Sequence, residues 1–166
     1  MGAQGSKGTT AKQLPQLLAI GLIQDARAYV ECARLLDHHQ GVNAKYVQPT
    51  YFLLCQAIEL ALKAHLAASG VPERTLRSKK IGHNIDVALR HARRVGFAPA
   101  DDRFPELVQW LAPYHLDHLF RYRKGNGFHQ LPRASEAAEI IHNIVEPVDA
   151  YVRRQYLATQ DKKQRR

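Results

Sequence analysis

Cysteine is scarce in this sequence. The 166 residues contain only Cys32 and Cys55. Two cysteines exclude the disulfide framework of small secreted domains, and their separation is not that of a zinc-binding Cys pair. Each lies within an apolar pattern of helical period, so we expect two buried free thiols.

Long hydrophobic runs are also missing. No stretch reaches the roughly 18 uninterrupted apolar residues of a membrane span, and residues 1–12 lack the apolar core of a secretory signal. We therefore expect a cytoplasmic protein without membrane association. The hydrophobic fraction of 45% and the charged fraction of 23% are ordinary for a globular chain, and the length suits one domain.

Acidic residues are fewer than basic ones, 15 Asp and Glu against 24 Lys and Arg, which gives a net charge of +9. Much of the excess lies at the ends of the sequence, in residues 1–12 and 153–166. Two further basic stretches, residues 74–94 and 121–133, lie in the body. A basic surface gives salt-dependent attraction to RNA or DNA, and the two inner stretches would form one if they met in space.

The sequence shows no strand pattern and no internal repeat. Apolar spacings of three and four predict helices over residues 14–36, 49–68 and 84–95, then from 102 to 122 with a break or kink at Pro113, and from Ser135 onward. We expect an all-α antiparallel bundle of four to five helices over 13–155. A disordered segment, 1–12, would precede it, and a basic tail, 156–166, would follow it. The inward stripe of the first helix is predicted to be Leu18, Leu22, Ala26, Tyr29, Ala33 and Leu36.

The second predicted helix is apolar around nearly its whole circumference, which indicates a central, buried position. Its polar exceptions form one stripe that contains Gln56, Glu59 and Lys63. Glu59 and Lys63 have the i, i+4 spacing of a helical ion pair, and His83, which leads the next helix, is a natural third member. The pattern favours a buried polar network that joins the two helices, with a ligand site as the alternative.

These two helices carry a family resemblance. The segment 51–64, YFLLCQAIELALKA, looks like the central helix of the HEPN (higher eukaryotes and prokaryotes nucleotide-binding) domains. Gly82-His83-Asn84-Ile85 is similar to the family's start of the next helix, and Phe120-Arg121-Tyr122 resembles an Arg-Tyr element of its uncharacterised bacterial branch. The resemblance spans roughly residues 14–155.

The resemblance implies a helical domain that commonly forms homodimers. Some members act as metal-independent RNases in toxin–antitoxin or phage-defence systems, others pair with a nucleotidyltransferase, and others have lost catalysis. The RNases carry Arg followed by His after four to six residues, a spacing that Arg123 and His129 meet. Two glycines lie between them, however, which predicts a loop where the family has a helix start.

Cleavage of RNA without a metal needs a group that moves the proton of the ribose 2′-OH and a cation that stabilises the phosphorane. His129 would do the first and Arg123 the second, supported by Glu59, His83, Arg121 and Tyr122. The plainer interpretation is that Arg123 and His129 are exposed residues of a basic loop. His115 and His118 have a spacing that allows two metal ligands, but two ligands do not make a site, so we expect no metal and no cofactor.

Three functions follow as hypotheses. The first is a dimeric HEPN-like module that associates with nucleic acid or nucleotides without catalysis. The second is the metal-independent RNase, with Arg123 and His129 at its site. The third is a protein-interaction module that pairs with a nucleotidyltransferase. The sequence leaves open whether the protein is an enzyme.

Overall fold

The computed structural model describes residues 14–40, 46–78, 81–122 and 131–164. Within these ranges the chain forms six helices and no strand, so the predicted all-α class is confirmed. The helices are α1 (Leu14–Gln40), α2 (Val47–Ala68), α3 (Glu73–Leu76), α4 (Ile85–Arg94), α5 (Phe104–Leu116) and α6 (Ala134–Gln164).

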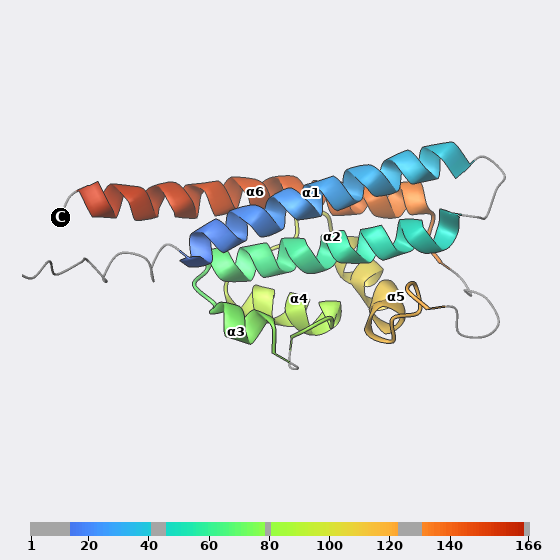
Figure 1. Cartoon of the computed structure of the whole chain (residues 1–166), viewed down its shortest axis with the longest axis horizontal. Coiled ribbons are helices and arrows are strands. Elements are labelled where there is room, and N and C mark those ends of the chain that lie inside the picture. The colour runs from blue at the N-terminus through green and yellow to red at the C-terminus, as the bar shows by residue number, and fades with distance from the viewer. Residues whose placement is uncertain (1–13, 41–45, 79–80, 123–130, 165–166) are drawn as a thin grey trace, which may run out of the picture.

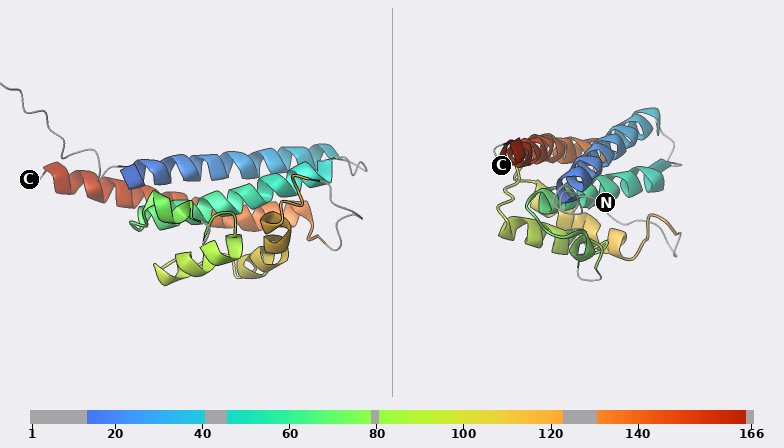
Figure 2. Two further views of the ribbon diagram at one scale, coloured as in Figure 1. Left: turned by 60° about the horizontal axis from the view of Figure 1, so that its bottom comes forward. Right: turned by 60° about the vertical axis from the view of Figure 1, so that its left-hand side comes forward.

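Helix α2 is the centre of the fold and packs against each of the other five helices. The three long helices α1, α2 and α6 lie together, and α3, α4 and α5 cover the opposite side of α2 (Figures 1 and 2). Of its 22 residues 15 are buried, as the nearly continuous apolar circumference predicts. By length and composition alone α2 would pass as a membrane span, yet 78% of its apolar window is buried inside the protein, which is the pattern of a core helix.

The bundle is not uniformly antiparallel, in contrast to the prediction. Helix α1 runs opposite to α2 and α6, but α2 and α6 run in the same direction (Figure 1). Two side-chain contacts fix this register: the Tyr51 hydroxyl donates to the Pro132 carbonyl near the start of both helices, and the Ser69 and Tyr151 hydroxyls lie 3.0 Å apart further along. The segment that contains α3, α4 and α5 returns the chain to the starting end of α2, which makes the parallel pairing possible.

Helix α1 buries a stripe that shares Ala26 and Ala33 with the predicted one and is otherwise shifted by one residue, to Ala19, Ile23 and Val30. Its fully buried residues are mostly small: Ala19, Ile23, Ala26, Val30 and Ala33. The larger Leu18, Leu22 and Tyr29 are only partly buried at the edge of this contact. Small side chains let α1 approach its neighbours closely, so the largest apolar residues do not mark the contact face. Cys32 is consequently exposed, and only Cys55 is the buried thiol that the sequence predicted.

Helix boundaries differ from the prediction in three places. The single-turn helix α3 was not predicted. Helix α5 runs through Pro113 to Leu116, so the helix is not broken at this proline, and residues 117–122, which were expected to continue the helix, form turns instead. Helix α6 extends to Gln164, so most of the segment assigned to a basic tail, 156–166, is helical.

Candidate functional site

The most concentrated polar chemistry in the described part of the chain surrounds Glu59, on the side of α2 that faces α4 and α5. Its Oε1 accepts a hydrogen bond from Lys63 Nζ at 2.6 Å. Its Oε2 lies 2.6 Å from His115 Nε2 and 3.1 Å from His83 Nδ1. We call these four residues the Glu59 cluster. The Glu59 carboxylate thus links α2 through His83 to the start of α4, and through His115 to the end of α5.

The Glu59 carboxylate is ionised at neutral pH. Its side chain is only 4% exposed, and burial by itself would raise its pKa. The hydrogen bonds from His115, Lys63 and His83, together with the Lys63 charge, outweigh burial and lower the pKa of Glu59 from 4.5 to about 2. A buried carboxylate of this kind is stable only while its partners stay in place.

His83 is positioned by a tight turn before α4. Gly82 has φ +36, and a Cβ there would lie 3.2 Å from the Ser78 carbonyl oxygen, so the turn needs glycine. Asn84 then caps α4, with its side-chain oxygen accepting from the Val87 amide at 3.0 Å. The cap confirms the predicted start of this helix. His83 is therefore held against Glu59 through Nδ1 while its side chain remains 49% exposed.

His115 and His118 come from the end of α5. The His118 amide donates to the His115 carbonyl and the Leu119 amide to the Tyr114 carbonyl, which is the Schellman arrangement. Helices α2 and α4 end in the same way, but with Gly70 and Gly96 in the left-handed position. Helix α5 has His118 there, with φ 56, where a side chain costs about 1–2 kcal/mol. The ring centroids of His118 and His83 are 5.5 Å apart.

Strained residues of this kind concentrate at functional sites. The chain uses glycine where only a helix stop is needed and histidine where the stop lies beside the Glu59 cluster. Sequence reasoning did not connect His118 with the Glu59 cluster, because its approach to His83 depends on how α5 packs against α2 and α4.

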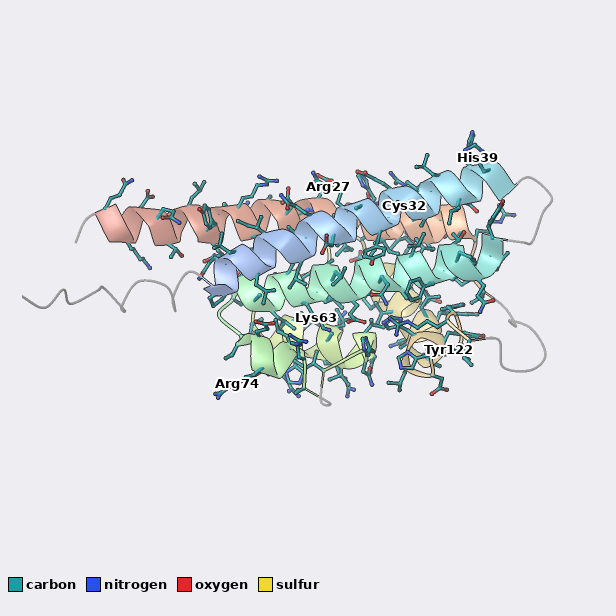
Figure 3. The ribbon with its side chains drawn as sticks, viewed as in Figure 1. Arg27, Cys32, His39, Lys63, Arg74 and Tyr122 are labelled. Carbon is teal, nitrogen blue, oxygen red and sulfur yellow. The ribbon has the colours of Figure 1, made fainter. Side chains whose placement is uncertain are left out.

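Arg121 lies on the same side of the molecule. Its guanidinium carbon is 5.3 Å from the centroid of the Phe52 ring, seven residues before Glu59 on α2. A shallow depression is lined by Phe52, Tyr114, His115, His118, Phe120 and Arg121. Tyr122 follows as an exposed side chain at this end of the molecule (Figure 3). The predicted supporting residues Glu59, Lys63, His83 and Arg121 thus belong to one region, and His115 and His118 are the members that sequence reasoning did not assign to it.

Arg123 and His129, the predicted catalytic pair, lie outside the described residues. The described chain stops at Tyr122, directly after Arg121, and resumes at Leu131.

Comparisons with protein-family models, curated proteins and solved structures give no significant match. The function has therefore to be inferred from the chemistry of this site. A neutral His83 that donates Nδ1–H to Glu59 keeps a lone pair on Nε2, which can accept a proton or a hydrogen bond. Arg121 adds a permanent positive charge with donors suited to phosphate.

Proposed function

We propose that the protein is a HEPN-like helical domain that binds phosphate-bearing ligands, RNA or nucleotides, on the surface formed by His83, His118 and Arg121 over the Glu59 cluster. The observation that carries this proposal is that His83 and His115 hydrogen-bond one buried carboxylate, while His118 and Arg121 line the depression beside His115. Of these residues, Glu59, His83 and Arg121 also belong to the resemblance to the HEPN family.

The charges of the region favour an anionic ligand. Glu59 is the one carboxylate of the cluster, and its charge is already matched by Lys63 at 2.6 Å. Within the four residues of the Glu59 cluster, His83 and His115 thus face a carboxylate whose charge Lys63 already balances. An exposed guanidinium next to aromatic rings also suits a nucleobase, which stacks on π faces and on Arg planes.

The test is RNA affinity as a function of salt. Arg121→Ala should weaken binding of a fluorescent single-stranded RNA and lower the slope of log K against log salt by about 0.7, the value for one lost phosphate contact. Arg74→Ala removes another exposed arginine, on α3 at the other end of the same face of the molecule (Figure 3), and should change neither quantity. Thermal unfolding of both variants checks that the fold is intact. Equal losses in the two variants would show diffuse attraction to the basic surface and would refute the proposed site.

A second function, metal-independent RNA cleavage by Arg123 and His129, is supported by their spacing, which meets that of the Arg and His of the HEPN RNases. In this case His129→Ala should abolish cleavage that persists with a chelator, whereas His142→Ala, on α6, should leave it unchanged. Cleavage that survives His129→Ala would remove the assignment and leave the binding function.

A further inference from the structure

We propose that Glu59, His83 and His115 form a binding site for a divalent transition-metal ion of the Zn²⁺ class. Their donor atoms, a carboxylate oxygen and one nitrogen from each ring, all lie within 4.8 Å of one another. The three residues are far apart in sequence, so no ligand spacing predicts them. The inference is independent of the phosphate-binding proposal, because it concerns the ion alone.

The geometry is close to that of a tetrahedral ion. Bonds of about 2.1 Å place neighbouring ligand atoms about 3.4 Å apart. Glu59 Oε2 lies 3.1 Å from His83 Nδ1 and 2.6 Å from His115 Nε2, so entry of an ion requires the second pair to open by less than about 1 Å. The His83 and His115 ring centroids are 6.1 Å apart, compared with about 5 Å for two rings that share such an ion.

The donor set selects the class of ion. Two imidazoles and one carboxylate are the protein ligands of many catalytic zinc sites, which keep the fourth position open. Mg²⁺ and Ca²⁺ prefer all-oxygen sites and are not expected to compete. His83 is 49% exposed, so the fourth position can face solvent and take a water molecule or an anionic oxygen. Each neutral ring would bind through the nitrogen that faces Glu59 and carry its proton on the other nitrogen.

Lys63 gives the inference a directional test. Its Nζ donates a hydrogen bond to Oε1 of Glu59, whereas the histidines contact Oε2. Its ammonium would repel a bound cation, and its side chain, 12% exposed, can move toward solvent along its flexible stem. Removing this charge with Lys63→Met should therefore tighten metal binding by at least about tenfold. A purely structural role for Lys63 predicts no such gain.

The experiment uses the full chain with Cys32→Ser, because an exposed thiol binds zinc by itself. Calorimetry with Zn²⁺ and absorption spectroscopy with Co²⁺, both without RNA, should show one ion per chain and the intense visible bands of tetrahedral Co²⁺. His83→Ala, at a half-exposed position, should weaken binding at least about 10–100-fold, the range known for loss of outer-shell partners alone. Glu59→Gln should weaken binding similarly.

The control is His38→Ala with His39→Ala, which removes two exposed histidines of α1. If this control abolishes binding while His83→Ala does not, the ion binds only adventitiously at the surface and the site is refuted. Absence of tetrahedral Co²⁺ bands in the unaltered site also refutes it. Either result leaves the RNA measurements, made with a chelator present, as a separate test of the proposed function.

Discussion

Replacing Glu59 by glutamine tests the energetics of the cluster. Glutamine keeps the shape of the side chain but removes the charge that Lys63, His83 and His115 surround. The pKa of Glu59 falls from 4.5 to about 2 in the folded protein. The difference of about 2.5 pH units, at about 1.36 kcal/mol each, corresponds to ~3 kcal/mol of stability.

The pH range of the effect follows from the direction of this change. A carboxyl group with a lowered pKa in the folded protein stabilises it fully above the unfolded value, here 4.5, and the stabilisation is lost as pH falls toward about 2. At about pH 6 the free energy of unfolding of Glu59→Gln should therefore be lower than that of the wild type by ~3 kcal/mol. At about pH 3 this difference should be smaller.

Urea unfolding of metal-free protein, with a chelator present, measures the free energy of unfolding of the wild type and the variant at the two pH values. Glu73→Gln is the matched control, because Glu73 makes an exposed i, i+4 pair with Arg77 at 3.2 Å. Such a pair contributes about 0–1 kcal/mol. The reasoning fails if Glu59→Gln is as stable as the wild type at about pH 6, or if its deficit is the same at about pH 3.

Three further predictions concern the elements around the site. His118→Gly should stabilise the fold by about 1 kcal/mol in urea unfolding, because glycine relieves the left-handed backbone at φ 56. The same variant should weaken RNA binding. A variant that is less stable and binds RNA normally would argue against a functional reason for the strain. Asn84→Ala should lower the free energy of unfolding by about 1 kcal/mol through loss of the α4 cap. The control Asn143→Ala, which removes only a partly buried hydrogen bond to Asp101, should leave the amide exchange of α4 unaffected. Under native conditions a thiol reagent should modify exposed Cys32 quickly and Cys55 only after unfolding, because burial, with a smaller contribution from Glu59, raises the pKa of the Cys55 thiol far above its usual range; fast modification of both thiols would contradict the described packing.

The central helix and its polar stripe could be predicted because both depend on local pattern. An almost wholly apolar helix has to be buried, and a Glu–Lys pair on such a helix needs further partners. His83 was predicted to be one because it leads the next helix. The structure confirms the contact, with His83 Nδ1 3.1 Å from Glu59 Oε2.

His115 could not be assigned to the cluster in the same way. It lies 56 residues from Glu59, and whether the two meet depends on the angle at which α5 crosses α2. The parallel pairing of α2 and α6 escaped prediction for a similar reason, since it depends on the path of the chain between residues 69 and 133. The buried face of α1 was predicted correctly at Ala26 and Ala33 only, because spacings of three and four fit Ala19, Ile23 and Val30, which are buried, as well as they fit their neighbours Leu18, Leu22 and Tyr29.

The most direct test of the binding surface is NMR of the histidine side chains, with imidazole nitrogens observed during titration with adenosine monophosphate and with a short single-stranded RNA. A phosphate ligand over the Glu59 cluster should shift the signals of His83 and His118 in a saturable way, while His91 on α4 and His142 on α6 stay unchanged. Saturable shifts confined to His91, His142 or other histidines away from the cluster, or no saturable shift at all, would contradict the proposal.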